Sequence, residues 1–234
     1  MKKVKALLMG SLIVNLLFIG ATGFIVYKQG GISFIKEQIG NAASPQELPD
    51  YYLQKKDIFE SLNTAKPDKV FIGDSITDHG EFQEYYPGQA VLNRGIAEDT
   101  SKGVLNRIDE AAKRYPKEVY LMIGINDIAA GVEADSYRRN IEKIIQSFDE
   151  NSTKVILQSI LPINNQDFNN EISNEKIHQF NKILQEIAEE NSLEFVNLHT
   201  AFEAPNGQLR KEITIDGIHL KGKGYDIWFE QLSK

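Results

Sequence analysis

The 234-residue sequence contains no cysteine. Disulfides therefore cannot stabilise it, and a lipid-modified N-terminal cysteine is excluded. Histidine is also scarce, since the chain has only His79, His178, His199 and His219. No spacing among its histidines, aspartates and glutamates indicates a metal site. Any domain that this chain forms must be stabilised by its apolar core alone.

Charge is absent from the run between Ala6 and Tyr27, in which Asn15 is the only strongly polar residue. A helix of this length spans roughly 30 Å of hydrocarbon. The three lysines within residues 1–5 predict an N-terminus in the cytoplasm and the remainder outside it. We predict a basic cytoplasmic tail over residues 1–5 and a transmembrane signal anchor over residues 6–27.

The alternative to an anchor is a signal peptide that is cleaved to release a secreted protein. Ala21-Thr22-Gly23 is a poor cleavage site, and the apolar run continues beyond it. We therefore favour a single-pass protein of the cell membrane, with secretion after cleavage as the alternative. Residues 28–50, with Gly30-Gly31, Pro45 and Pro49, are typical of a linker.

The formal net charge is −7, and residues 1–40 hold five lysines and one glutamate, so residues 41–234 carry about −11. Binding to nucleic acid requires clustered lysine and arginine against the phosphates. We therefore expect no nucleic-acid partner, and membrane contact only through the N-terminal helix. Residues 51–234 are enough for one domain with a well-buried core.

Five short apolar runs alternate with helical periodicity in this domain. They cover residues 69–72, 90–92, 119–123, 155–160 and 193–198, and apolar helical stripes lie within residues 137–148, 177–187 and 225–232. Runs that are apolar at nearly every position are typical of strands buried on both faces of a parallel sheet. The alternation predicts an α/β fold, with helices on both faces of that sheet.

Polar motifs follow these strands, where the sites of parallel sheets form. They are Gly73-Asp74-Ser75, Asn93-Arg94-Gly95 and Gly124-Ile125-Asn126-Asp127, and Asp216-Gly217-Ile218-His219 precedes the last helical stripe. Each motif alone is ordinary turn or helix-cap chemistry. Because one edge of the sheet can gather all four, their combination carries more information than any one of them.

Together, these motifs supply the groups that acyl transfer requires. Ser75 is the candidate nucleophile, His219 the base, and Asp216 the group that orients the base. The backbone N–H groups of Ser75 and Gly95 and the side-chain amide of Asn126 are candidate oxyanion donors. Glycine at position 95 would let a backbone N–H approach a ligand closely.

The order and context of these segments, from about Val70 to the C-terminus, resemble the SGNH or GDSL hydrolases. The likeness is greatest to esterases of the platelet-activating-factor acetylhydrolase and lysophospholipase-like types. The resemblance implies a flavodoxin-like, three-layer α/β/α fold with a five-stranded parallel sheet. It also implies the triad Ser75, Asp216 and His219, the oxyanion hole of Ser75, Gly95 and Asn126, and neither a metal nor an organic cofactor.

One departure concerns the second motif, where relatives often have further glycines. This chain has Ala97 and Glu98 there, which would place bulk and negative charge near the pocket and weigh against anionic substrates. The candidate residues of the substrate pocket are Ile76, Asp99, Pro162, Ile163 and Ile218.

We predict a serine esterase that cleaves carboxylic esters through an acyl-enzyme. Lipid, carbohydrate and small-molecule esters all fit the sequence, which does not fix the oligomeric state either. One alternative is an extracytoplasmic O-acetyltransferase or deacetylase of cell-wall polysaccharide. Another, of a different class, is a non-catalytic, membrane-tethered binding domain, against which the complete set of motif residues argues.

Overall fold

Five parallel strands form the centre of the fold, in the spatial order β2-β1-β3-β4-β5. The structure is a computed structural model and describes residues 49–62, 66–168 and 172–234. The strands are β1 (Lys69–Gly73), β2 (Val91–Gly95), β3 (Glu118–Met122), β4 (Lys154–Gln158) and β5 (Glu194–Val196). This arrangement confirms the predicted α/β fold with a five-stranded parallel sheet.

The central strands are buried on both faces, as their uninterrupted apolar runs predicted. Val70, Phe71 and Ile72 of β1 are at most 1% exposed. The last strand is shorter than its apolar run, because Asn197 caps a new helix by accepting a hydrogen bond from the N–H of Thr200. The run over residues 193–198 is therefore divided between β5 and that helix.

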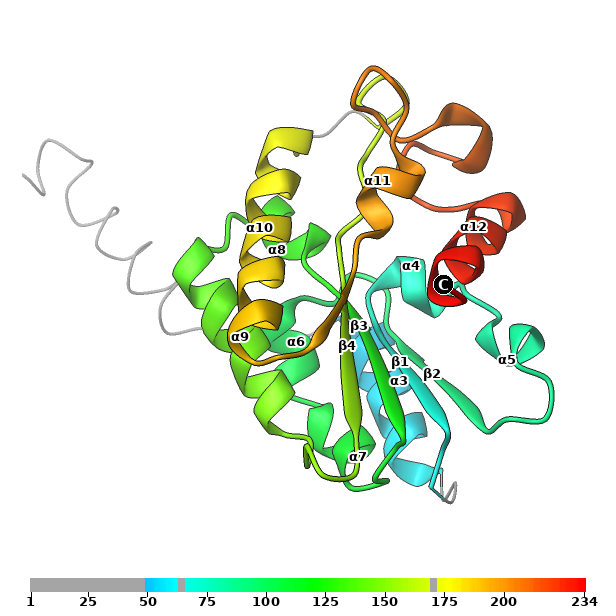
Figure 1. Cartoon of the computed structure of the whole chain (residues 1–234), viewed down its shortest axis with the longest axis vertical. Coiled ribbons are helices and arrows are strands. Elements are labelled where there is room, and N and C mark those ends of the chain that lie inside the picture. Colours follow the sequence, from blue (N-terminus) through cyan, green and yellow to red (C-terminus); the bar gives the residue numbers. More distant parts are fainter. Residues whose placement is uncertain (1–48, 63–65, 169–171) are drawn as a thin grey trace, which may run out of the picture. The chain divides into compact units, whose positions relative to one another are not determined.

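Helices cover both faces of the sheet. Figure 1 shows α9 and α10 on one side of it and α5 and α12 on the other. The helices are α3 (Asp50–Ser61), α4 (Ser75–Asp78), α5 (Phe82–Tyr85), α6 (Ser101–Leu105), α7 (Ile108–Ala112), α8 (Ile125–Ala129), α9 (Ala134–Gln146), α10 (Asn174–Glu190), α11 (Leu198–Phe202) and α12 (Gly222–Leu232), with the 3-10 helix η1 (Lys211–Ile213). The three apolar stripes of the sequence correspond to α9, α10 and α12.

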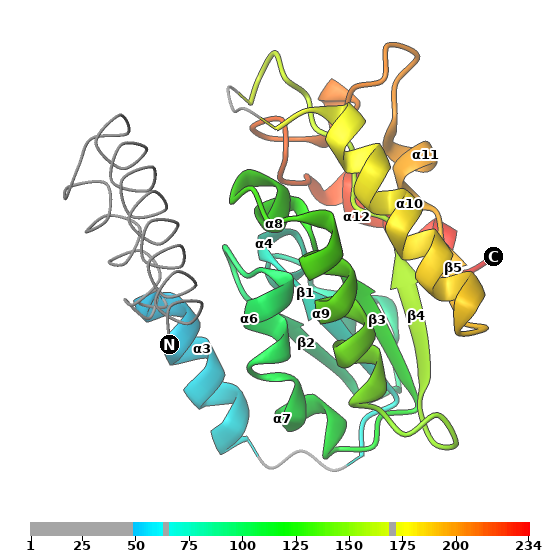
Figure 2. The same ribbon diagram turned by 90° about the vertical axis from the view of Figure 1, so that its left-hand side faces the viewer.

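Helix α3 was not predicted, and it begins at the residue that was to end the linker. Only Tyr52 and Phe59 among its twelve residues are buried, which is too few to give a helical stripe. Both pack with Ile96, and the Tyr52 hydroxyl donates to the carbonyl of Gly103 at 2.8 Å. Figure 2 shows α3 beside α6 and α7, the helices that follow β2.

The predicted tail, the anchor over residues 6–27 and the linker up to residue 48 lie outside the described residues. Within the described part of the chain, no helix is both long enough and apolar enough to cross a membrane. The residues from Pro49 to Lys234 form one compact unit.

The carboxyl ends of β1, β2 and β3 lie level with one another, and this brings the residues that follow them to one place. Gly73 at the end of β1 pairs with Gly95 of β2 on one side and with Met122 of β3 on the other. The residues that follow these three strands therefore emerge at the same edge. Figure 2 shows α4 and α8 together at this edge.

Candidate active site

The structure brings the three predicted triad residues together. The Nε2 atom of His219 lies 2.9 Å from the Oγ atom of Ser75, and its Nδ1 atom lies 2.6 Å from the Oδ2 atom of Asp216. An ionised carboxylate only accepts hydrogen bonds, so Nδ1 carries the proton and Nε2 presents its lone pair to the serine hydroxyl. This is the geometry that a base needs in order to activate a hydroxyl nucleophile.

The loop before α12 holds Asp216 and His219 in place. The Oδ1 atom of Asp216 accepts the N–H groups of Ile218 at 3.1 Å and His219 at 2.8 Å. Gly217 has a positive φ of 92°, and a Cβ atom there would lie 2.7 Å from the carbonyl oxygen of Asn164. Burial opposes the ionisation of Asp216, but the hydrogen bonds from His219 and Ile218 outweigh it and hold the pKa below its usual range.

Ser75, the candidate nucleophile, is the first residue of α4 and is half-buried. Asp74 caps this helix, because its Oδ1 atom accepts the N–H of Ile76 at 3.0 Å. Its carboxyl is only 2% exposed, and burial raises the pKa of Asp74 to about 7. Asp74 therefore belongs to the turn that presents Ser75, whereas His219 is the titratable side chain that contacts the Ser75 hydroxyl.

The N–H of Gly95, predicted as an oxyanion donor, is already engaged. It donates to the Oδ1 atom of Asn93 at 2.7 Å. A Cβ atom at Gly95 would lie 2.1 Å from the backbone nitrogen of Asp78 in α4, so the glycine lets β2 pack against the nucleophile helix. The structure gives Gly95 a packing role and does not offer its N–H to a substrate.

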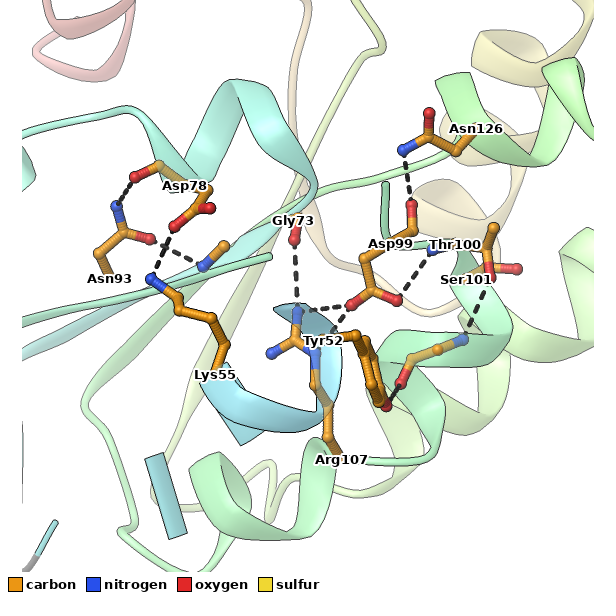
Figure 3. A network of polar contacts seen from close by, with 12 residues as sticks. Tyr52, Lys55, Gly73, Asp78, Asn93, Asp99, Thr100, Ser101, Arg107 and Asn126 are labelled. Atoms are coloured by element: carbon orange, nitrogen blue, oxygen red, sulfur yellow. Dashed lines mark hydrogen bonds and ion pairs between the residues drawn. The ribbon is translucent and has the colours of Figure 1, made fainter. Parts of the chain in front are cut away.

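The backbone N–H of Glu98 is a further candidate donor, which was not predicted from the motif. Glu98 has a positive φ of 64°, and its N–H has no acceptor among the described residues. The residue after it, Asp99, accepts the side-chain amide of Asn126 through its carbonyl oxygen at 2.8 Å (Figure 3). One N–H of that amide is thus engaged and the other is left over, so Glu98 and Asn126 are neighbours with a free donor each.

Asp99, a predicted pocket residue, braces this loop instead. Its carboxylate accepts the Nε–H of Arg107 at 2.8 Å and the N–H of Thr100 at 2.9 Å (Figure 3). Arg107 also donates to the carbonyl of Gly73 at 3.3 Å, which ties the loop to the end of β1. Burial raises the pKa of Asp99 to about 6, against the opposing effect of Arg107.

The other predicted pocket residues are also buried. Ile76 is 3% exposed, Ile163 1% and Ile218 7%, and all three pack in the main apolar core. Pro162 is buried as well. These side chains therefore present little of their surface to solvent. The ring of His79 is exposed, and its centre lies 5.2 Å from that of His219, which places it at the rim of the site.

Comparison with known proteins identifies the family to which this chain belongs. Residues 71–227 match the GDSL-like Lipase/Acylhydrolase family. The isoamyl acetate-hydrolyzing esterase of Saccharomyces cerevisiae is 25% identical over 167 residues, which are 64% of this chain and 70% of that protein. An N-acylneuraminate cytidylyltransferase of Streptococcus agalactiae serotype V is 23% identical over 172 residues, 74% of this chain and only 39% of that protein.

Solved structures agree with the sequence relatives. A Streptococcus pneumonia structure named for platelet activating factor is 30% identical with a TM-score of 0.72, over 85% of this chain and 97% of that one. A GDSL-like lipase from Bacteroides thetaiotaomicron is 28% identical with a TM-score of 0.67, over 78% and 95% of the two chains. The chain therefore belongs to the GDSL-like lipase/acylhydrolase family.

Proposed function

We propose that the protein is a serine esterase that hydrolyses carboxylic esters through an acyl-enzyme on Ser75. The observation that carries the proposal is the unbroken chain of contacts from Asp216 through His219 to Ser75, at 2.6 and 2.9 Å. Membership of the acylhydrolase family and the esterase among its relatives support the same reaction class.

Each step uses groups of this chain. The Oγ atom of Ser75 attacks the ester carbonyl carbon as its proton passes to Nε2 of His219, and Asp216 stabilises the imidazolium that forms. The protonated His219 then gives that proton to the leaving alcohol. In the second step, His219 takes a proton from water, the resulting hydroxide attacks the acyl carbon, and Ser75 recovers its proton as the acid leaves.

The oxyanion of each tetrahedral intermediate needs preorganised donors. We assign this role to the N–H groups of Ser75 and Glu98 and to the second N–H of the Asn126 amide, because Gly95 is engaged with Asn93. The N–H of Ser75, like that of Glu98, has no acceptor among the described residues. Removing one such donor typically costs about 100- to 1000-fold in turnover.

The burial of the predicted pocket residues favours a short acyl group. Because Ile76, Ile163 and Ile218 are packed in the core, their side chains offer little exposed apolar surface to a long acyl chain. The yeast relative is named for the hydrolysis of an acetate ester. A series of p-nitrophenyl esters from acetate to octanoate tests this: kcat/KM should fall as the acyl chain lengthens, and a rise would contradict the proposal.

The decisive experiment on the nucleophile replaces Ser75. Ser75→Ala should lose p-nitrophenyl acetate hydrolysis and labelling by a fluorophosphonate probe, whereas Ser61→Ala, at an exposed position of α3, should keep both. If the Ser75 variant keeps most of its activity, the assignment is wrong. Failure of the probe to label the wild-type chain would instead favour a non-catalytic binding domain.

We also propose that the esterase domain lies outside the cytoplasm, attached to the cell membrane. The predicted anchor over residues 6–27 would hold the esterase on the outer side of the cell membrane. Protease added to intact cells should then digest the domain. In cells that are not treated with protease, the full-length chain should be found in the membrane fraction. Release of an N-terminally shortened form into the medium would favour the cleaved signal peptide.

A further inference from the structure

A second group of ionisable side chains lies on elements that do not carry the triad. His178 belongs to α10, and His199 and Glu203 lie four residues apart, on α11 and at its C-terminal end. One potential ligand atom from each lies within 4.8 Å of those of the other two. The Oε1 atom of Glu203 is 3.8 Å from Nε2 of His178 and 3.8 Å from Nε2 of His199.

The orientation of His199 is the most informative feature of this cluster. Its Nδ1 atom lies 3.1 Å from the carbonyl oxygen of Ile160 and 3.3 Å from the side-chain amide nitrogen of Asn181. We assign the proton to Nδ1, because the carbonyl oxygen can only accept a hydrogen bond and is the nearer of the two contacts. The nearby amide of Asn181 donates to that same carbonyl at 2.9 Å. Nε2 of His199 therefore presents a lone pair, and it points toward Glu203 and His178.

That lone pair has no partner in the described part of the chain. His199 is only 4% exposed, and its Nε2 atom is buried without a hydrogen bond. A buried polar atom without a partner costs free energy, which a bound group that accepts the lone pair would recover.

From these contacts we propose that His178, His199 and Glu203 bind a divalent transition-metal ion, with Zn²⁺ as the best match. Two imidazole nitrogens and one carboxylate oxygen are a common set of protein ligands for zinc, with water in the fourth position. Zinc bonds of about 2.0–2.2 Å place neighbouring ligand atoms about 3.3–3.6 Å apart in a tetrahedral site. The two separations of 3.8 Å need only a small contraction to reach this range.

The surroundings suit a metal ion. The hydrogen bond from Nδ1 of His199 to a backbone carbonyl is the usual second interaction of a metal-bound histidine. The three side chains line a cavity of about 190 Å³, and the side chain of His178 is 55% exposed, so an ion can reach the site from solvent. Lys182 also lines the cavity, but its positive charge is paired with Glu186 at 3.9 Å, outside the three ligands.

Such an ion would join α10 to α11. The segment after Glu203 leads through η1 to the loop of Asp216 and His219, but no hydrogen bond or ion pair of the described residues joins the three ligands to the triad. We therefore expect the ion to stabilise the fold and to leave ester hydrolysis to Ser75. This site was not predicted, because His178 lies 21 residues before His199 and on another helix, and only the fold brings the two together.

Calorimetric titration of the full-length, metal-free chain with ZnCl₂ tests the proposal. We expect saturable binding of one Zn²⁺ per chain. Zn²⁺ should bind about 100-fold more tightly than Mg²⁺, which prefers oxygen ligands. Zinc at about 100 times its Kd should raise Tm by about 5 °C. His178→Ala and Glu203→Gln should each weaken zinc binding about tenfold or more and lose the rise in Tm. The absence of saturable zinc binding by the wild-type chain would overturn the proposal.

Matched variants separate this site from zinc bound elsewhere. Gln179 and Glu175 are exposed residues of α10, the helix that carries His178. The Gln179→Ala and Glu175→Gln variants should bind zinc like the wild type. His219→Ala removes the triad imidazole and should also keep the binding. Zinc binding that survives both His178→Ala and Glu203→Gln, or that disappears with His219→Ala, contradicts the proposed site. Because Glu203→Gln preserves the shape of the side chain, loss of binding in that variant is not explained by unfolding.

Discussion

The Oδ1 atom of Asn93 accepts the N–H of Gly95 at 2.7 Å, two residues further along β2. The amide group of the same side chain donates to the carbonyls of Thr77 at 2.7 Å, Gly80 at 2.8 Å and Asp78 at 3.2 Å. Asn93 therefore fastens the end of the nucleophile helix to the neighbouring strand. One side chain both occupies the predicted oxyanion donor and positions the turn that presents Ser75.

Asn93→Ala should lower both stability and activity. The variant leaves the N–H of Gly95 without its acceptor and removes the donor to the carbonyls of Thr77, Asp78 and Gly80, which we expect to cost about 2–4 kcal/mol of the free energy of unfolding. Urea denaturation measures this loss. We also expect kcat for p-nitrophenyl acetate to fall about tenfold or more, because small displacements of a nucleophile are costly.

Asn106→Ala is the matched control, because its side chain is exposed and it follows α6 rather than β2. Exposed substitutions of this kind usually change stability by no more than about 0.5 kcal/mol. If Asn93→Ala is as stable and as active as Asn106→Ala, Asn93 does not hold the nucleophile turn.

Glu98→Gly should stabilise the protein and keep its activity. Glu98 has a φ of 64°, a conformation that costs a residue with a Cβ atom about 1 kcal/mol or more and costs glycine nothing. Part of this gain is lost to the greater entropy of glycine in the unfolded chain, so we expect a net gain of about 0.5 kcal/mol. The backbone N–H is retained, and kcat should stay within about twofold of the wild type because the proposed oxyanion donor is intact.

Glu98→Gln separates backbone strain from charge, because it removes the carboxylate and keeps the Cβ atom. Its stability should match that of the wild type in urea denaturation. A gain in Glu98→Gln equal to that in Glu98→Gly would assign the effect to the charge, and a loss of stability in Glu98→Gly would contradict the strain.

The features that the sequence predicted well are local ones. Each strand is an apolar run that can be recognised from a few consecutive residues. Ser75 stands in a motif directly after a strand, and Asp216 and His219 stand in a motif just before a helix. The level ends of parallel strands then bring distant motifs to one edge, so the two motifs of the triad could be joined although Ser75 and His219 are 144 residues apart.

The features that it missed depend on contacts between distant residues. Gly95 carries the glycine of its motif, but only the packing of Asp78 against it and the hydrogen bond to Asn93 reveal that its N–H is engaged. Helix α3 depends on Tyr52, whose partner Gly103 lies 51 residues away. The burial of the predicted pocket residues could not be read from the sequence for a similar reason, since it depends on what the rest of the chain packs against them.

Asp216→Asn should reduce catalysis while preserving the fold. The carboxamide cannot stabilise the imidazolium of His219 as a carboxylate does, and it can favour the wrong tautomer of the ring. We expect kcat/KM for p-nitrophenyl acetate to fall about 10³- to 10⁴-fold. Asp226→Asn, at an exposed position of α12 where Asp226 accepts the Tyr85 hydroxyl, is the control and should keep the wild-type rate. Equal rates in the two variants would remove Asp216 from the triad.

Asp74→Asn should stabilise the protein most at alkaline pH. The pKa of Asp74 is about 7 in the folded chain because of burial, against an ordinary value of 3.8. Between these two values the folded state binds more protons than the unfolded state, so the stability that Asp74 contributes falls as the pH rises and is lost above pH 7. Asparagine does not titrate and keeps the acceptor oxygen for the N–H of Ile76. The stability advantage of Asp74→Asn over wild type should therefore grow by about 2–3 kcal/mol between pH 5 and pH 8, at 1.36 kcal/mol per pKa unit.

Asp149→Asn provides a control with the opposite shift, since hydrogen bonds from Asn151 hold the pKa of the Asp149 carboxyl below its ordinary value. A depressed pKa contributes stability above the unfolded value and loses it only as the pH falls through the folded value. The difference between Asp149→Asn and wild type should thus be the same at pH 5 and pH 8. Urea denaturation at both pH values compares the two variants. An Asp74→Asn difference that is equally independent of pH would mean that Asp74 is ionised in the folded protein throughout this range, and that its burial beside Ser75 does not set its charge.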